Sequence, residues 1–309
     1  MEGDVMTHIE VTFLGTTASI PTKYRNHPAI FLRYQSEQEH VYLFDCGEGT
    51  QRQITILGDP SVNFMRINDI FITHWHADHF AGLFGLLETL SLEGRKRDLR
   101  IFAPEAEEFV SLIDSFGYSS KPFNIIPINV EHIGTKPQVL IDEEEYQIVG
   151  IPVDHGIPAV GYGFIEKNRV NIDKDKAKAL GLPDKGPIYH KLKANGKVIF
   201  KDKVVKLEDI SLVEEGKKVV YSGDTRPSQN IINLSKNADL LIHDSTYFED
   251  FKRKHTTFKD VLKIAKEAGV KQLALTHISR RYSDIRKLKE MVEKYPSVIL
   301  AKDFMQLKI

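Results

Sequence analysis

Short apolar runs, rich in β-branched and aromatic residues, recur along the chain, and each stops abruptly at polar residues. Runs of this length, bounded by Gly, Pro or acidic residues, are typical of strands buried in a layered protein. His74 follows one of these runs directly, and His277 follows another. The pattern therefore predicts buried strands whose ends carry reactive side chains, at residues 41–44, 70–73, 149–153, 219–222, 240–242 and 273–276.

Between these runs, apolar residues recur at helical spacing. They lie at residues 83–90, 261–265 and 285–292. Strands interleaved with helices argue for sheets covered by helices. We therefore expect a layered α/β protein, and no linker or internal repeat divides the chain.

The stretch from residue 166 to residue 206 breaks this pattern. It contains twelve basic and five acidic residues, a local net charge of +7, and shows little apolar periodicity. We interpret it as an insertion that projects from the core, partly helical around residues 174–180. The alternative is a solvated, lysine-rich loop without a partner.

Composition limits the classes of protein to consider. With 309 residues, 41% hydrophobic and 28% charged, the chain has the proportions of a soluble globular protein. The net charge of −1 provides no global positive field, so any polyanion site must be a local patch. The single cysteine, Cys46, excludes an intrachain disulfide and fits a reducing compartment. We see no signal-peptide pattern and no apolar run near the roughly 20 residues of a membrane helix, so we expect a cytoplasmic protein without membrane contact.

The strongest chemical signal is the segment His74-Trp75-His76-Ala77-Asp78-His79, directly after a predicted strand. Imidazole and carboxylate are ligands that suit Zn²⁺, with Mn²⁺ and Fe²⁺ as alternatives. In an extended turn His74 and His76 can face one way, while Asp78 and His79 curl around a second point. A lone buried histidine is usually a packing residue, but this combination predicts a metal site able to hold two ions.

Further ligands should be His or Asp residues at other strand ends. Four histidines, His155, His243, His255 and His277, lie at or beside such positions, and Asp224 is the matching acid. Each alone could be a helix cap or a turn residue. Together they favour one metal site, and we expect surface or packing positions for His8, His27, His40, His132 and His190.

The order of these residues resembles the metallo-β-lactamase superfamily. Further motifs narrow the resemblance to the ribonuclease Z family, the tRNA 3′-processing endonucleases. Residues 21–26 are similar to that family's P-x-K-x-R-N loop. The other matching stretches are residues 13–16, 44–51, 71–79, 222–226, 243–246, 255–257 and 276–282, so the resemblance spans nearly the whole chain.

The resemblance implies an αββα sandwich, a single domain over residues 1–309. The basic stretch at about 166–206 would be the family's protruding, flexible tRNA-binding arm. Family members act as homodimers, in which the arm of one subunit binds the tRNA that the other subunit cleaves. The implied partners are therefore precursor tRNA and a second copy of the chain.

The resemblance also implies a ligand set. One Zn²⁺ would be held by His74, His76 and His155, and a second by Asp78, His79 and His277. Asp224 would bridge the two ions, and Mn²⁺ is a possible substitute for zinc.

The implied reaction removes the 3′ trailer from precursor tRNA and leaves a 3′-hydroxyl on the tRNA and a 5′-phosphate on the trailer. Two metals would activate the attacking water, and Asp78 would take its proton. His255, oriented by Asp244, would be the general acid for the departing 3′-oxygen. Many relatives carry His-Glu-Ala-Thr where this chain has His243-Asp244-Ser245-Thr246, so the carboxylate here is one methylene shorter. Asp45 could accept a hydrogen bond from a ligand histidine.

Basic and aromatic residues beside these motifs are candidates for substrate binding. Phosphate contacts and base stacking would involve Lys23, Arg25, Arg226, Arg280, Arg281 and Tyr282, and in the arm Lys185, Gly186 and Pro187. The alternative for each basic residue is a solvated surface charge.

Two other functions fit parts of the pattern. The metal motif also suits a hydrolase that acts on a small ester, thioester or cyclic phosphodiester. An RNA-binding or metal-binding protein without catalysis would need a disabled site, whereas every expected ligand is present.

Overall fold

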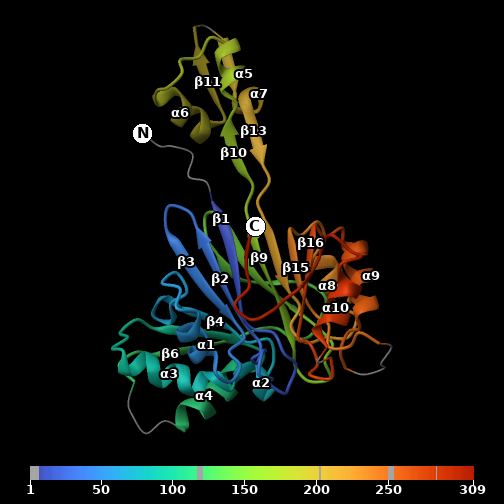
Figure 1. Cartoon of the computed structure of the whole chain (residues 1–309). Coiled ribbons are helices and arrows are strands. Elements are labelled where there is room, and N and C mark those ends of the chain that lie inside the picture. Colours follow the sequence, from blue (N-terminus) through green and yellow to red (C-terminus); the bar gives the residue numbers. More distant parts are fainter. Residues whose placement is uncertain (1–6, 117–120, 202, 250–253, 283) are drawn as a thin grey trace. The chain divides into compact units, whose positions relative to one another are not determined.

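The computed structural model describes residues 7–116, 121–201, 203–249, 254–282 and 284–309. The chain forms two compact units. The larger comprises residues 1–142, 147–165 and 217–309, and the smaller comprises residues 143–146 and 166–216 (Figure 1). We describe each unit by itself.

The first sheet of the larger unit has seven strands in the order β18-β1-β2-β3-β4-β5-β6. Strands β18, β1, β2 and β3 pair antiparallel, whereas β3, β4, β5 and β6 pair parallel. The strands are β1 (His8–Gly15), β2 (Ala29–Gln35), β3 (Glu39–Phe44), β4 (Asp69–Phe71), β5 (Leu99–Ala103), β6 (Ile125–Asn129) and β18 (Gln306–Lys308).

The second sheet also has seven strands, in the order β17-β16-β15-β14-β9-β8-β7. Strands β14 to β17 are parallel, and β9 pairs antiparallel with β14. The strands are β7 (Gln138–Asp142), β8 (Tyr146–Pro152), β9 (Val160–Glu166), β14 (Lys218–Tyr221), β15 (Leu240–Asp244), β16 (Gln272–Thr276) and β17 (Val298–Leu300).

Buried aromatic side chains join the two sheets face to face. The Tyr162 ring on β9 lies 5.8 Å from Phe44 and 5.2 Å from Phe71, between ring centres. Its hydroxyl donates a hydrogen bond of 2.8 Å to the carbonyl of Ile72. A buried hydroxyl needs such a partner, so this contact fixes one sheet against the other.

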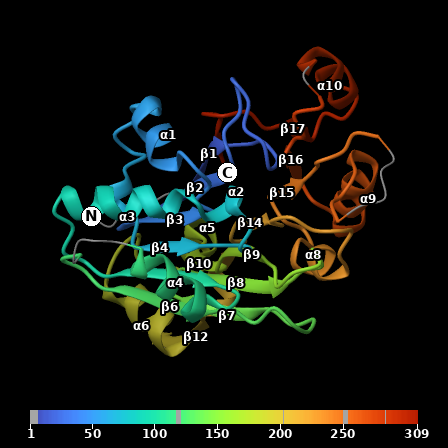
Figure 2. The same ribbon diagram turned by 90° about the horizontal axis from the view of Figure 1, so that it is seen from below.

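Helices cover the outer face of each sheet. Helices α1 (Thr50–Leu57), α3 (Gly82–Leu92) and α4 (Ala106–Ser115) bury their apolar faces on the first sheet. Helices α8 (Gln229–Leu234), α9 (Phe258–Ala268) and α10 (Ile285–Val292) do so on the second. Figure 2 shows these two groups of helices on opposite sides of the sheets. The expected αββα sandwich is confirmed.

The predicted elements agree with this architecture. The six apolar runs overlap β3, β4, β8, β14, β15 and β16, and the three helical patterns coincide with α3, α9 and α10. The other elements of the larger unit were not predicted: strands β1, β2, β5, β6, β7, β9, β17 and β18, helices α1, α4 and α8, the 3-10 helix η1 (Phe64–Arg66) and helix α2 (Ala77–Phe80). Helix α2 has only four residues, too few to show a period.

The smaller unit has its own two-stranded sheets and a small core. Strand β10 (Arg169–Ile172) pairs with β13 (Ser211–Glu214), and β11 (Lys197–Phe200) pairs with β12 (Lys203–Lys206). The helix expected around residues 174–180 is confirmed as α5 (Lys174–Ala179), and α6 (Pro187–Asn195) and α7 (Leu207–Ile210) complete the unit. The core consists of Ala177, Leu182, Leu192, Val205 and Ile210.

The expected insertion ended at residue 206, whereas the smaller unit continues to residue 216, because β13 pairs with β10. Residues 207–216 contribute four acids and no base, so the positive charge is confined to the earlier part of the unit. Asp202, one of the acids in the expected insertion, lies outside the described residues.

Across the described ranges of the chain, no helix has the length and apolar character needed to cross a lipid bilayer.

Candidate metal centre

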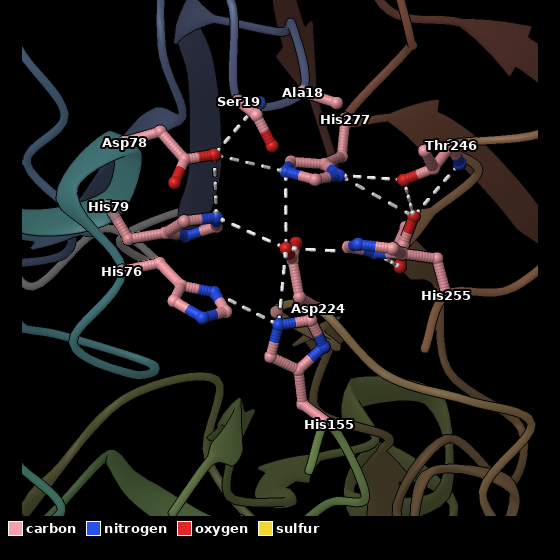
Figure 3. Close-up of polar contacts among 12 residues, drawn as sticks. Ala18, Ser19, His76, Asp78, His79, His155, Asp224, Thr246, His255 and His277 are labelled. Atoms are coloured by element: carbon pink, nitrogen blue, oxygen red, sulfur yellow. Dashed lines mark hydrogen bonds and ion pairs between the residues drawn. The ribbon is translucent and has the colours of Figure 1, made fainter. Parts of the chain in front are cut away.

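Loops that follow strands of both sheets bring the predicted ligands together. His74, His76, Asp78 and His79 follow β4, and the other predicted ligands follow strands of the second sheet. In layered α/β proteins the edge formed by the strands' carboxyl ends is where sites are commonly built. Figure 3 shows that the side chains from the two sheets point toward one another.

The first group of ligand atoms comprises three histidines and Asp224. His76 Nδ1 lies 2.9 Å from His74 Nε2 and 3.1 Å from His155 Nε2. The Asp224 Oδ2 atom lies 3.9 Å from Nε2 of both His74 and His155. All these atoms fall within 4.8 Å of one another, close enough for one metal ion.

The second group lies on the other side of Asp224. His277 Nε2 is 3.2 Å from Asp224 Oδ2 and 3.5 Å from Asp78 Oδ2. His79 Nε2 is 3.4 Å from Asp224 Oδ2 and 3.7 Å from Asp78 Oδ2. One oxygen of Asp224 therefore faces both groups, as a bridging ligand must.

The ligand imidazoles are oriented through their second ring nitrogen. Nδ1 of His79 lies 2.7 Å from Asp45 Oδ2, and Nδ1 of His277 lies 2.8 Å from the Thr246 hydroxyl. These contacts direct both Nε2 atoms toward Asp224. Such partners fix the ring orientation and raise ligand basicity.

The expected hydrogen bond between Asp45 and a ligand histidine is thereby confirmed. Asp45 is fully buried and also accepts from the Thr73 backbone, the Thr73 hydroxyl and the Tyr221 hydroxyl, the last at 2.7 Å. Because Tyr221 belongs to the second sheet, this carboxylate ties both sheets to His79. A buried charge is tolerated when it is hydrogen-bonded in this way.

The chemistry of the site fits a bound metal pair. Among the described residues, His79 Nε2, His277 Nε2 and Asp224 Oδ1 are buried without a hydrogen-bond partner. Buried polar atoms without a partner destabilise the folded state unless a bound ion or water satisfies them. Neutral imidazoles and carboxylates are the ligands preferred by zinc, so the residues present fit such ions.

Burial keeps the first-group imidazoles neutral. It lowers the pKa of His155 to about 4, although Asp224 opposes this, and holds the pKa of the fully buried His74 well below its usual value. Only a neutral imidazole offers a lone pair to a metal. His76, in contrast, is exposed, so the first group opens to solvent.

His255 and Asp244 form a hydrogen-bonded pair beside the second group. The distance from His255 Nδ1 to Asp244 Oδ2 is 2.9 Å. Burial lowers the pKa of His255, but the Asp244 carboxylate outweighs this effect and raises the pKa above its usual value. The imidazole can therefore hold a proton that its Nε2 can release.

Several of the predicted substrate-binding residues line one surface cleft of about 240 Å³. Lys23, Arg280 and Tyr282 contribute to it, together with Tyr24. Lys23 and Arg280 are exposed, whereas the Tyr282 hydroxyl accepts a hydrogen bond of 2.9 Å from the Phe248 backbone.

Arg25 is placed differently from its neighbours. Its residue is only 8% exposed, and its guanidinium donates hydrogen bonds of 2.6 Å to the Thr16 hydroxyl and the Ala301 carbonyl. Arg25 also lines the cleft with Lys23 and Arg280, and its contact with substrate stays a prediction.

The remaining predicted substrate residues are not among those that line that cleft. Nη1 of Arg226 lies 2.8 Å from both carboxylate oxygens of Asp154, and Arg281 is exposed. Lys185, Gly186 and Pro187 are exposed in the smaller unit, where Gly186 and Pro187 begin α6.

Sequence reasoning missed several residues that shape the site. Thr73, Thr246 and Tyr221 hydrogen-bond the ligands or Asp45, and the Ser19 backbone amide donates to Asp78. Tyr221 and Ser19 carry no local signal, since their partners lie far away in the sequence. His243, considered because it ends a run, is buried, and its Nδ1 lies 2.8 Å from the Asp244 carbonyl; it belongs to neither ligand group.

Comparison with protein families agrees with this geometry. The model of the Metallo-beta-lactamase superfamily matches residues 24–203. A second model, of the Beta-lactamase superfamily domain, matches residues 202–278.

Individual relatives are similar over almost their whole length. Ribonuclease Z of Archaeoglobus fulgidus is 40% identical, with 97% of each chain covered. Ribonuclease Z of Methanosarcina acetivorans is 38% identical over 97% of this chain and 98% of its own. Among solved structures, human tRNase Z, short form, has a TM-score of 0.68 at 27% identity, covering 96% of this chain and 98% of its own. The chain therefore belongs to the ribonuclease Z family of the metallo-β-lactamase superfamily.

Proposed function

We propose that this chain is a zinc-dependent endoribonuclease that removes the 3′ trailer from precursor tRNA. It leaves a 3′-hydroxyl on the tRNA and a 5′-phosphate on the trailer. The observation that carries the proposal is the pair of ligand groups meeting at Asp224, with a histidine–carboxylate pair beside them. The relatives named Ribonuclease Z and tRNase Z support the substrate class.

Each ligand group would hold one zinc ion, with Mn²⁺ as a possible substitute. His74, His76 and His155 serve the first ion, Asp78, His79 and His277 the second, and Asp224 lies between them. When bound, two such ions supply a water of lowered pKa and offset the negative charge of the phosphoryl group.

Asp78 would take the proton of the attacking water. Burial favours its neutral form, but the neighbouring imidazoles of His277 and His79 outweigh burial and lower the pKa of Asp78 below its usual range. The carboxylate is therefore ionised. The Ser19 amide, 2.9 Å from Asp78 Oδ2, holds it in place.

His255 would protonate the departing 3′-oxygen. Asp244 occupies its Nδ1, so Nε2 is the nitrogen left to donate. A general acid of this kind accelerates a reaction when its proton is available near the working pH.

Substrate contacts complete the proposal. The cleft with Lys23, Arg280 and Tyr282 would receive the RNA near the cleavage point, and Arg226 and Arg281 would add phosphate contacts. The basic stretch at 166–206, including Lys185, Gly186 and Pro187, would act as the flexible arm that binds the tRNA body. The chain would work as a cytoplasmic homodimer, with the arm of one subunit holding the tRNA cleaved by the other.

The deciding experiment is cleavage of a precursor tRNA with a 3′ trailer, with zinc or manganese added and with a chelator as control. A single metal-dependent cut near the acceptor end, with a 3′-hydroxyl and a 5′-phosphate, is the expected result. The variant Asp78→Ala should abolish it. If metal binds and no cut appears, a small-substrate hydrolase becomes the better interpretation.

A further inference from the structure

An internal hydrogen-bond network closes the loop between β1 and β2, here called the 16–26 loop. The Asn26 carbonyl accepts from the backbone amides of Thr16 and Thr17 at 2.9 and 3.0 Å. The buried guanidinium of Arg25 donates to the Thr16 hydroxyl and to the Ala301 carbonyl, both at 2.6 Å. The two ends of the loop are therefore held together and fastened to the C-terminal segment.

Asp303 completes this network from that segment. Its Oδ1 accepts the Thr16 hydroxyl at 2.7 Å, and its Oδ2 accepts the Asn26 amide at 2.7 Å and the Gln53 side chain at 3.0 Å. The Thr16 hydroxyl thus accepts from Arg25 and donates to Asp303. Both hydrogen-bonding capacities of this hydroxyl are used, as a buried side-chain network requires.

The 16–26 loop reaches the second ligand group at Asp78. The Ser19 amide donates a hydrogen bond of 2.9 Å to Asp78 Oδ2 (Figure 3). Ser19 has a φ angle of 32°, in the left-handed region that residues other than glycine rarely adopt. Such strain persists only where the surroundings determine the conformation, and it marks functional segments. The Ser19 carbonyl is also held, 3.2 Å from His27 Nε2.

The same loop is joined to the residue that follows His277. The Ala18 amide donates to the Ile278 carbonyl at 3.1 Å, and the Ile278 amide donates to the Thr16 carbonyl at 3.0 Å. His277 itself has a positive φ of 57°. The 16–26 loop therefore contacts the carboxylate of Asp78 and the backbone beside His277, two members of the second ligand group.

We propose that Arg25, Thr16 and Asp303 are positioning residues, which hold the 16–26 loop so that it places Asp78 and His277 of the second ligand group. This inference rests on the proposed two-metal hydrolase. It gives Arg25, which also lines the cleft, a role inside the protein, where its guanidinium holds the loop through Thr16 and Ala301. Replacing a residue that orients metal ligands without touching the metal typically lowers metal affinity or activity by about 10–100-fold.

The test uses the variants Arg25→Met and Asp303→Asn, with Thr16→Val as a milder change that keeps the buried volume. Two matched controls remove similar groups elsewhere. Arg95→Met removes a guanidinium that is 2% exposed and donates to the Ile67 and Asp98 carbonyls. Asp239→Asn removes a carboxylate charge that is 7% exposed and accepts from Lys218 and Lys271.

Two readouts do not depend on activity. In chelator competition the parent and the controls should release two zinc ions alike, whereas the network variants should release one of the two about 10–100-fold more readily. In the zinc-free protein, amide hydrogen exchange of residues 16–26 should be faster in the network variants alone, since a loosened loop opens more often.

Kinetics then separate positioning from RNA contact. The network variants should lower kcat about tenfold or more on both precursor tRNA and bis(p-nitrophenyl) phosphate, with the KM for tRNA within about twofold of the parent. If Arg25→Met raises only the KM for tRNA and leaves zinc affinity intact, Arg25 contacts RNA and the inference is wrong. Equal losses in the Arg95 and Asp239 controls would also overturn it.

A failure of the proposed function gives a different pattern. A parent that binds zinc but does not cleave precursor tRNA would contradict the function. Zinc release and hydrogen exchange would still decide whether the network positions the second ligand group.

Discussion

At the residue scale, the His255–Asp244 pair depends on a short carboxylate. Asp244 Oδ1 accepts from the Thr246 amide and hydroxyl at 2.9 and 2.6 Å, which leaves Oδ2 for His255. The aspartate side chain is one methylene shorter than that of a glutamate, and its hydrogen bond to His255 is formed at 2.9 Å. The shorter side chain therefore supports the imidazole in this chain.

Replacing His255 tests its role as a general acid. His255→Ala should lower kcat on precursor tRNA by about 10²–10⁴-fold, because the departing 3′-oxygen then lacks a proton donor. On bis(p-nitrophenyl) phosphate the loss should be much smaller, since p-nitrophenolate leaves without protonation. Steady-state kinetics on both substrates measure the difference. Equal losses on the two substrates would argue against proton donation by His255.

Asp303 gives a pH-dependent contribution to stability. Burial raises its pKa from 3.8 to about 6, although hydrogen bonds from Thr16 and Asn26 and the charge of Arg25 oppose this. The folded state then favours the protonated carboxyl, so the stabilisation is full below 3.8 and is lost as pH rises through about 6.

The matching variant is Asp303→Asn, which cannot titrate. The free energy of unfolding of the parent, minus that of the variant, should fall as pH rises from about 4 to about 7. Urea unfolding of the zinc-free proteins at several pH values measures it. A difference that is constant with pH would show that Asp303 does not titrate in this range.

At the scale of elements, the site depends on close backbone contacts and on helix caps. The turn after β3 packs against helix α2, which carries Asp78 and His79: the Cys46 amide donates to the His79 carbonyl at 2.7 Å. A β-carbon on Gly47 would lie 2.3 Å from the Asp78 carbonyl oxygen. Only glycine allows this approach, because any side chain would push helix α2 away.

Helix α9 begins directly after the His255 loop, and its start is fixed by a capping box. The Thr257 hydroxyl accepts from the Asp260 amide at 3.2 Å, and Asp260 Oδ2 accepts from the Thr257 amide and hydroxyl. Thr257→Ala should therefore lower the free energy of unfolding by about 1 kcal/mol. Urea denaturation measures this value.

A fitting control is Thr55→Ala, in which an exposed threonine in α1 is replaced. Its effect on the free energy of unfolding should stay within about 0.5 kcal/mol, because no cap is lost. Equal effects in both variants would mean that the capping box contributes little.

At the scale of the whole molecule, the ligand groups and the basic stretch lie in different units. The larger contains both ligand groups, and the smaller contains the basic stretch. The ends of the long insertion meet: a β-carbon on Gly216 would lie 2.1 Å from the Glu166 carbonyl oxygen. Residues 167–215 can therefore be replaced by a short Gly-Ser linker without stretching the larger unit.

This excision separates RNA binding from hydrolysis. We expect kcat/KM for precursor tRNA to fall by about 100-fold or more, because backbone contacts from basic residues supply much of the affinity for nucleic acid. Hydrolysis of bis(p-nitrophenyl) phosphate should stay within about twofold. Parallel loss of both activities in a folded variant would contradict the role of the basic stretch.

Much of the ligand set could be identified from the sequence because its signals are local. Three histidines and an aspartate within one turn, and further His and Asp residues directly after apolar runs, mark strand ends without knowledge of the fold. The αββα sandwich was predicted from the resemblance to the family, because interleaved strands and helices by themselves fit several layered folds.

What the sequence determined by itself is therefore six of the strands and the candidate ligand types, which depend on residues close together in the chain. Only the tertiary structure decided that Arg25 is buried, that Tyr221 reaches Asp45, and that residues 166–216 have a core of their own. Each of these depends on a contact between distant segments, and burial turns an apparently solvated charge into part of an internal network. The sequence alone does not distinguish a basic loop residue that faces RNA from one that is buried in the protein.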